Sequence, residues 1–439
     1  MEHERDVSAV SVQRRSYDGS PALVVEWDFT VHGGSFGEHE ADLFAAACAE
    51  AVDASTPLVT VLRSGGTRLQ EGMRALVGIP RATLALADVR AAHLPHIAVA
   101  ASPTTGGVWV AIGSPADLRV GVRGATVGFS GPRVIEAMTG SRLPEGANTA
   151  ESALAAGLLD DVVGADEVDA WVGHALRVLS APATTREATA SQQAAPPDRL
   201  GWEQVRHSRS VVRASGRDLA AALLDERVPL RGGDDSVAAW VGRLDGRPVV
   251  TVALAAERAG RATPAGYHLL CRAARLAGSL GLPLVSLVDT AGADPLPDSE
   301  QAGVAGAIAS ALSDVLACPA PTIAVVHGEG GSGGALAAAV CDVVAVTAEG
   351  WFAALSPEGA AAALRREPAD AANLMRVSPA ELLADGFADA IVPCEPLALG
   401  EWLATALERL GTMDPVVRRQ QRDRRWRGAL RPPRPDASP

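Results

Sequence analysis

Short apolar runs alternate with alanine-rich stretches along most of the chain. The apolar runs have the length of β-strands and are rich in valine, whereas the alanine-rich stretches predict helices. This alternation is typical of an α/β fold. The predicted strands form two sets: ALVVEW, LVTVLR and HIAVAA in the first half, and PVVTVAL, LPLVSLVD and TIAVVH in the second.

A segment of low hydrophobicity separates the two sets. Residues 181–200 (APATTREATASQQAAPPDRL) are rich in Ala, Thr, Gln and Pro, which predicts a linker. We therefore expect one domain over residues 1–180 and a second over residues 201–414. Because residues 414–439 hold eight arginines and three aspartates, we expect residues 415–439 to form a basic, disordered tail.

The two halves contain an internal repeat, over residues 96–134 and residues 322–360. In each copy an apolar strand leads to a glycine pair, an Ala/Val-rich helix, a short strand and a Gly/Pro turn, in that order. We expect the two domains to be duplicates of one fold.

The glycine pairs of the repeat are Gly106-Gly107 and Gly333-Gly334. Without a Cβ atom a ligand can approach the backbone, and the N–H groups at a helix start point toward it. Such a turn can bind an oxyanion, and two turns could stabilise two negative charges that face each other. Glycine pairs also permit tight packing of a strand against a helix, and the spacing leaves both interpretations open.

The second turn also matches two familiar motifs. Residues 328–333 fit the dinucleotide motif GxGxxG, but this motif lies deep within its half, and its repeat partner TTGGV lacks it. Residues 330–334 fit GxSxG, the nucleophile elbow of α/β-hydrolases, which place the catalytic histidine after the serine. The last of the nine histidines is His327, which excludes a hydrolase of that order and leaves Ser332 as a small residue at a helix start.

Composition excludes several kinds of chemistry. All 39 basic residues are arginine, so the chain can form no Schiff base or Walker P-loop and cannot carry covalently bound biotin. The formal net charge of −13 argues against nucleic acid as the main partner. The opening residues lack an apolar leader and no long apolar span follows, so we expect a cytoplasmic protein with no membrane association. Five dispersed cysteines without CxxC predict buried thiols and no bound metal.

Several blocks of the second half resemble one known family. VDTAGA from Val288, HGEGGSGGALA from His327 and SPEGAAAAL from Ser356 are similar to the α subunit of bacterial acetyl-CoA carboxylase carboxyltransferase. The first half resembles the β subunit of the same enzyme through WDFTVHGGSFGE, SGGTRLQEGMRAL, SPTTGGV and GFSGPRVIE. The resemblance implies a fused β-α chain of two tandem crotonase-like domains, each a spiral of ββα units. The chain departs from the family pattern because it lacks the four-cysteine zinc ribbon that usually opens the β subunit.

The resemblance implies an activity. A carboxyl group passes from carboxybiotin, carried on a separate protein, to the α-carbon of an acyl-CoA. Biotin itself takes the α-proton, so that the protein needs two oxyanion holes rather than a side-chain base. We expect acyl-CoA, a biotin carboxyl carrier protein and a biotin carboxylase as partners, and a homo-oligomer of at least two chains.

The resemblance also implies site residues. We expect the thioester hole at the N–H groups of Gly106, Gly107 and Val108, and the biotin hole at those of Gly333, Gly334 and Ala335. Further substrate-binding residues are expected at Gly65, Gly66, Arg68, Gly131, Arg133, Gly330, Gly331 and Ser332. The arginines that flank the first-half glycine blocks are candidates for binding the CoA phosphates, and Arg68 is the best placed. They are Arg63, Arg68, Arg74 and Arg133.

Two other functions stay open from the sequence. One is a malonyl-thioester decarboxylase, and the other is a non-catalytic paralogue that acts as a scaffold in a complex. The sequence does not identify the acyl group, because the residues of the substrate pocket are scattered over loops.

Overall fold

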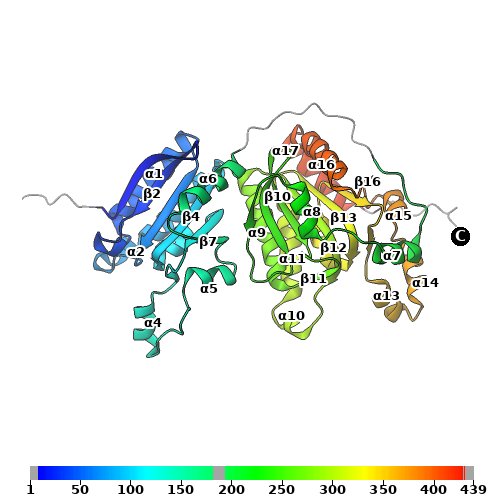
Figure 1. Ribbon diagram of the computed structural model, residues 1–439, viewed down its shortest axis with the longest axis horizontal. Helices are drawn as coiled ribbons and strands as arrows, with labels where there is room; N and C mark the ends of the chain where they lie inside the picture. The colour runs from blue at the N-terminus through cyan, green and yellow to red at the C-terminus, as the bar shows by residue number, and fades with distance from the viewer. Residues whose placement is uncertain (1–7, 181–192, 429, 431–439) are drawn as a thin grey trace, which may run out of the picture. The chain divides into compact units, whose positions relative to one another are not determined.

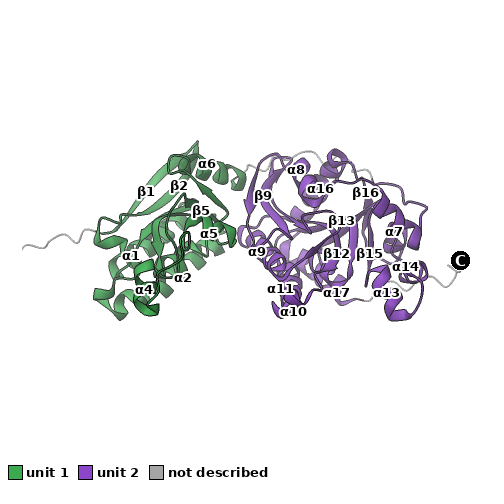
Figure 2. Ribbon diagram, turned by 60° about the horizontal axis from the view of Figure 1, so that its bottom comes forward, with its two compact units in different colours: residues 1–180 green, residues 181–439 purple. Residues whose placement is uncertain are grey.

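The computed structural model describes residues 8–180, 193–428 and 430. The chain forms two compact units, residues 1–180 and residues 181–439 (Figure 2). Most of the predicted linker, residues 181–192, lies outside the described residues, and residues 193–200 form no helix or strand. No helix in the described part of the chain is long and apolar enough to cross a bilayer.

Unit 1 is built on a seven-stranded sheet with the order β1-β2-β3-β4-β5-β7, and β6 pairs with β4. Strands β2, β4 and β7 of this sheet are labelled in Figure 1. Only the β1-β2 pair is antiparallel among these described strands. The strands are β1 (Val10–Tyr17), β2 (Ser20–Trp27), β3 (Leu58–Ser64), β4 (His96–Thr105), β5 (Leu118–Val122), β6 (Val127–Gly128) and β7 (Asp161–Val163). The helices are α1 (Glu38–Asp53), α2 (Met73–Ala91), α3 (Gly106–Val108), α4 (Pro132–Thr139), α5 (Ala150–Ala155) and α6 (Val168–Leu179), with short turns η1 (His32–Gly34), η2 (Leu69–Glu71) and η3 (Trp109–Gly113).

Unit 2 is built on a nine-stranded sheet with the order β16-β14-β13-β12-β10-β9-β8, to which β11 and β15 add beside β12 and β13. The strands are β8 (Arg227–Leu230), β9 (Ala238–Leu244), β10 (Arg247–Leu254), β11 (Gly260–Ala262), β12 (Leu284–Ala293), β13 (Thr322–Gly331), β14 (Val343–Thr347), β15 (Trp351–Ala353) and β16 (Ala390–Val392). The helices are α7 (Gly201–Ser210), α8 (Gly216–Leu223), α9 (Pro264–Leu280), α10 (Pro297–Gln301), α11 (Val304–Ala317), α12 (Ser332–Ala339), α13 (Pro357–Leu364), α14 (Pro368–Met375), α15 (Pro379–Ala384), α16 (Pro396–Gly411) and α17 (Pro415–Arg427).

The two units repeat one topology. The central strands β4 and β13 are both ten residues long, and each leads directly into a helix. Each also pairs near its end with a short extra strand, β6 or β15. The valine-rich strands in the middle of the two sheets, β3, β4, β12 and β13, are buried along most of their length, which is typical of parallel strands covered on both faces. The internal repeat of the sequence is therefore a structural duplication.

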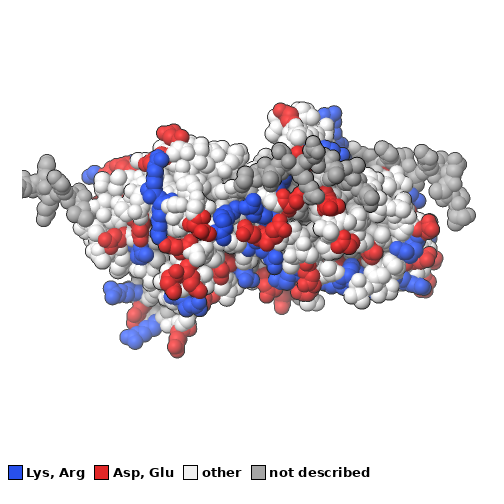
Figure 3. Space-filling view, turned by 45° about the horizontal axis from the view of Figure 1, so that its top comes forward, with Lys and Arg blue, Asp and Glu red and all other residues white. Residues whose placement is uncertain are grey.

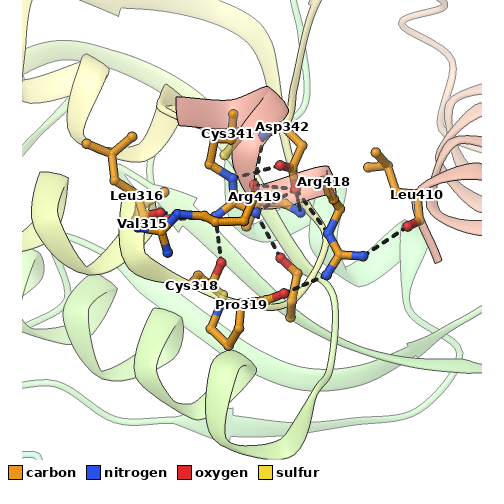
Figure 4. A network of polar contacts seen from close by, with 12 residues as sticks. Val315, Leu316, Cys318, Pro319, Cys341, Asp342, Leu410, Arg418 and Arg419 are labelled. Carbon is orange, nitrogen blue, oxygen red and sulfur yellow. Dashed lines mark hydrogen bonds and ion pairs between the residues drawn. The ribbon is translucent and has the colours of Figure 1, made fainter. Parts of the chain in front are cut away.

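Residues 415–427 form the helix α17, so the prediction of a disordered tail is wrong for them. The side chain of Asp414 caps the helix by accepting hydrogen bonds from the N–H groups of Val416 and Val417. Arg418 and Arg422 lie one turn apart, and both are buried. Figure 4 shows Arg418 between Leu410 and Pro319, whose carbonyls accept hydrogen bonds from its guanidinium. Arg422 forms a two-pronged ion pair with Asp342 and binds main-chain oxygens in the last turn of α11 and just after it. These oxygens belong to Val315, Leu316, Cys318 and Ala320.

This arrangement explains why charge alone misled the prediction. The last carbonyl groups of a helix lack intrahelical partners and carry partial negative charge. Arginines from α17 supply the missing donors, since Arg418 also binds the carbonyl of Pro319 and Arg419 binds that of Ala317. The arginines of α17 therefore attach this helix to the rest of unit 2. Residues 429 and 431–439 lie outside the described residues.

Candidate functional site

The first glycine turn joins β4 to α3. Gly106 begins the helix with a φ of 68°, and its backbone crosses that of Gly66, whose φ is 111°. A Cβ atom at Gly106 would lie 2.8 Å from the Cα atom of Gly66. Both positions therefore require glycine, because two chain segments approach each other there.

Two N–H groups of this turn point away from the helix without an acceptor. Gly107 and Val108 belong to the first turn of the helix, and their N–H groups have no acceptor among the described residues. The N–H group of Gly106 differs, since it donates to the carbonyl of Phe129 at 3.0 Å. The expected role of Gly106 as an oxyanion donor is therefore wrong, and its role is conformational.

The second turn joins β13 to α12, and Ser332 begins the helix with a φ of 61°. Because β4 and β13 have equal lengths, Ser332 is the counterpart of Gly106, and Gly333 is the counterpart of Gly107. The alignment of Gly106-Gly107 with Gly333-Gly334 is thus wrong by one residue. The sequence alignment paired glycine with glycine, whereas the equivalent residues in the structure are those at the same distance from the end of β4 or β13.

The N–H groups of Gly333 and Gly334 also have no acceptor in the part of the chain that is described. No atom lies within 4 Å of the position that a Cβ atom at Gly333 would take, so this residue faces open space. Gly334 is packed tightly, since its Cβ atom would lie 2.6 Å from both the backbone nitrogen of Ala293 and the hydroxyl of Tyr267. Ala335 is buried one residue deeper in the helix. Gly333 is therefore the accessible residue of the second turn.

The other glycines expected to contact substrate are explained by packing. A Cβ atom at Gly330 would fall on the ring of Phe352, and one at Gly331 would fall on the carbonyl of Ala291. These close contacts account for the glycines of the GxGxxG match without a dinucleotide. Both residues are buried, and the expectation that they contact substrate stays a prediction.

Gly65 and Gly66 have their N–H groups engaged within unit 1. Gly65 donates to the carbonyl of Gly33, and Gly66 donates to the hydroxyl of Ser64, both at 3.0 Å. Neither N–H group is available to a ligand. Gly131 caps the start of α4, where its carbonyl accepts hydrogen bonds from the two residues that follow Arg133.

Arg68, the first candidate for CoA phosphate, is already paired. Its guanidinium contacts Glu40 at 2.7 Å and Glu71 at 3.0 Å, and it also binds the hydroxyl and carbonyl oxygens of Ser35. Burial opposes the charge of Arg68, but the hydrogen bonds to the two carboxylates outweigh it and raise its pKa. The charge of Arg68 is therefore already compensated within unit 1, and its expected phosphate role stays a prediction.

Among the four candidate arginines, only Arg133 forms no ion pair with a described residue. Arg63 is paired with Glu26, and Arg74 with Glu38. Arg133 is exposed on α4 and forms no ion pair or hydrogen bond with any described residue. Three exposed apolar side chains lie on α4 or just before it: Phe129, Val134 and Met138. This surface offers one cation beside apolar area, next to the first turn through Phe129.

The thiols are not placed for chemistry. Burial raises the pKa of Cys48, Cys271 and Cys341 to about 12, which keeps these thiols protonated and unreactive. Four of the five cysteines are buried, as the apolar sequence around them predicts, and Cys394 is exposed. Within residues 8–180, 193–428 and 430, no group of three or more His, Cys, Asp or Glu residues is arranged to hold a metal.

Comparison with known proteins decides the family. Residues 185–410 match the model of the acetyl co-enzyme A carboxylase carboxyltransferase-like family. A Parafrankia protein described as acetyl-coenzyme A carboxylase carboxyl transferase subunits beta/alpha is 35% identical, over 95% of this chain and 77% of its own. The chain belongs to the acetyl-CoA carboxylase carboxyltransferase family. Its halves correspond to the fused β and α subunits, as the sequence blocks indicated.

A further relative and a solved structure are similar to this carboxyltransferase over most of the chain. A Mycobacterium tuberculosis protein described as a probable biotin-dependent acyl-coenzyme A carboxylase beta3 subunit is 38% identical, over 89% of this chain and 80% of its own. The solved structure of transcarboxylase 12S, a hexamer described with hydrolysed methylmalonyl-coenzyme A bound, has a TM-score of 0.76 and 25% identity. It covers 92% of this chain and 82% of that one. The predicted pair of crotonase-like domains is confirmed.

Sequence reasoning missed the ion pairs that support the second turn. Asp289 of the VDTAGA block is fully buried and binds Arg213, while Glu329 of the HGEGG block binds Arg209. The acids stood in recognisable blocks, but nothing in the sequence connects them to arginines more than 70 positions away.

Proposed function

We propose that this chain is the carboxyltransferase component of a biotin-dependent acyl-CoA carboxylase. The observation that carries the proposal is the pair of equivalent helix starts, each with two backbone N–H groups that have no acceptor among the described residues. Carboxyl transfer develops negative charge on two oxygens, one on the thioester and one on the ureido group of biotin. Two preorganised sets of N–H donors match that need.

The reaction requires little else of the protein. The carboxyl group leaves a ureido nitrogen of biotin, the α-proton of the acyl thioester moves to that nitrogen, and a carbon–carbon bond forms at the α-carbon. Gly107 and Val108 would bind the thioester oxygen, and Gly333 and Gly334 would bind the ureido oxygen. The exposed surface around Arg133 supports the first half of this assignment, because CoA carries phosphates and an apolar arm.

The partners follow from the same chemistry. A chain without lysine cannot be biotinylated, so the carboxybiotin must arrive on a separate carrier protein that a biotin carboxylase has loaded. We propose a homo-oligomer, which the hexamer described for transcarboxylase 12S supports, and a cytoplasmic location.

Replacement of Gly333 by valine tests the second turn. The position faces open space, so the larger side chain fits the fold but occupies the place of the ligand. We expect the rate of acetyl-CoA formation from malonyl-CoA and free biotin to fall by about 100-fold or more, the effect of losing an oxyanion donor. Other acyl-CoA substrates serve if the wild-type chain does not use malonyl-CoA.

Gly306→Val is the matched control, because Gly306 lies in the first turn of α11 and also has open space at its Cβ position. The control is expected to keep the wild-type rate. A folded Gly333→Val protein with an unchanged rate would exclude the second turn as an oxyanion site. A wild-type chain that transfers no carboxyl group with any acyl-CoA would favour a scaffold instead.

A further inference from the structure

The strand that leads to the second turn contains a bulge. In the β12-β13 pair Val288 lies opposite Val326, but Thr290 lies opposite Gly330. The three residues from His327 to Glu329 therefore face Asp289 alone. Bulges of this kind redirect a strand and are frequent beside functional sites.

A buried ion pair fills this bulge. Arg213, from the loop between α7 and α8, donates from Nε to one carboxylate oxygen of Asp289 at 2.9 Å and from Nη2 to the other at 2.7 Å. The exposed fractions of the two side chains are 8% and 0%. The same carboxylate accepts the backbone N–H of Glu329 at 2.8 Å, so it binds directly to the bulged strand. A Cβ atom at Gly328 would lie 2.2 Å from a carboxylate oxygen of Asp289 and 2.5 Å from Nε of Arg213, so only glycine fits beside the pair.

The ion pair lies at the base of the second turn. Glu329 is followed by Gly330 and Gly331, which pack on the segment that continues from Asp289, and then by the helix start. A shift of the bulge would therefore rotate the N–H groups that follow it. Burial opposes the charge of Asp289, but the hydrogen bond from Arg213 outweighs it and lowers the pKa of the carboxyl.

We propose that Arg213 and Asp289 are positioning residues for carboxyl transfer, which direct the N–H groups of Gly333 and Gly334 by holding the bulge of β13. This inference rests on the proposed function of the second turn. Neither residue contacts the reacting atoms, and both act through the backbone. An oxyanion site tolerates little displacement of its donors, so a small shift reduces the rate strongly.

The first turn is supported in another way. Its equivalent bulge lies opposite Arg63, which pairs with Glu26 on β2. There the hydroxyl of Thr104 bridges the bulge by donating to the carbonyls of Leu62 and Ala101, at 2.8 and 2.5 Å. The Arg213-Asp289 pair therefore supports the second turn alone, and loss of the pair should leave acyl-CoA binding at the first turn unchanged.

Asp289→Asn tests the proposal, with Asp342→Asn as the matched control. Asp342 also forms a two-pronged pair with an arginine, at 2.7 and 2.6 Å to Arg422, and also accepts a backbone N–H, from Thr322 at 2.9 Å. Thr322 begins β13, so the control lies at the opposite end of the same strand. We expect Asp289→Asn to lower kcat by about 10- to 100-fold with an unchanged KM for acyl-CoA, and Arg213→Lys to lower it less.

A second readout does not depend on activity. Amide hydrogen exchange of peptides that cover residues 328–338 should be faster in Asp289→Asn than in the wild type, and unchanged in Asp342→Asn. The proposal is overturned if folded Asp289→Asn keeps the wild-type kcat, or if both variants lose kcat equally. Unchanged exchange in Asp289→Asn would also overturn it. If the wild type shows no transfer, the exchange result still decides whether the pair holds the turn.

Discussion

Arg68 illustrates how a residue that the sequence offers to a ligand can be engaged by other residues of the fold. The sequence places it in a glycine-rich block near the first turn, which suggested a phosphate ligand. In the structure its side chain is only 16% exposed and lies between the carboxylates of Glu40 and Glu71. Glu40 is 1% exposed, so its charge depends on this arginine.

Arg68→Ala is therefore expected to lower stability rather than substrate affinity. Burial opposes the charge of Glu40, but hydrogen bonds from Arg68 and from the N–H of Ala9 outweigh it and lower the pKa of Glu40. Removal of the arginine leaves a buried charge unpaired, at a cost of about 3–5 kcal/mol in the free energy of unfolding. Urea unfolding measures this loss.

Arg74→Ala is the control, since the side chain of Arg74 is 76% exposed and its ion pair contributes little. An Arg68→Ala protein of wild-type stability with a raised KM for acyl-CoA would contradict the structural role and support the phosphate role.

At the scale of the elements, α17 shows that a run of arginines can form an ordered helix. Its arginines are spaced so that one face meets the exposed carbonyls of α11, while its apolar content is low. Hydrophobic patterning could not reveal this helix, because hydrogen bonds and ion pairs attach it rather than apolar burial. The local signals in the sequence were the cap residue Asp414 and the proline that follows it, Pro415, at the first helical position.

Arg422→Ala is expected to detach α17 from unit 2. Arg422 is fully buried, and its loss removes the two-pronged ion pair of the buried Asp342 and the donor to several carbonyls, which should lower the free energy of unfolding by about 3–5 kcal/mol. Limited proteolysis should then cut within residues 415–427, and urea unfolding should record the loss. Arg427→Ala, at an 83% exposed side chain, should change stability by less than about 0.5 kcal/mol. Equal effects of the two changes would contradict this account.

At the scale of the whole molecule, acidic residues outnumber basic ones, and the formal net charge is −13. Acidic and basic side chains are interspersed on the face shown in Figure 3. The arginines that sequence reasoning offered to ligands are mostly paired with carboxylates of their own unit. Ligand recognition then falls to backbone N–H groups and to the few cations that remain free, such as Arg133 on α4.

Each unit also contains one buried, neutral histidine. Burial lowers the pKa of His96 to about 3 and that of His327 to about 4, against an ordinary value of 6.5. As the pH falls below 6.5, the unfolded chain binds protons that the folded units do not, so stability falls with acidification. Between pH 6.5 and pH 5 the loss should be about 2 kcal/mol for each histidine.

Urea unfolding at pH 7.5, 6 and 5 measures this dependence. His327→Gln should weaken the pH dependence of unit 2, whereas His268→Gln, at an exposed position, should leave it unchanged. An unchanged pH dependence in His327→Gln would show that another group is responsible.

The sequence by itself determined the two-domain α/β duplication, the family and the place of both turns, because strand periodicity and glycine position are local properties of the chain. Only the tertiary structure decided which N–H groups of those turns are free. The N–H group of Gly106 donates to the carbonyl of Phe129, and the guanidinium of Arg68 pairs with two glutamates. The arginines of α17 bind carbonyls at the end of α11. Each outcome depends on a partner that folding brings from far along the chain, and no local pattern encodes that partner.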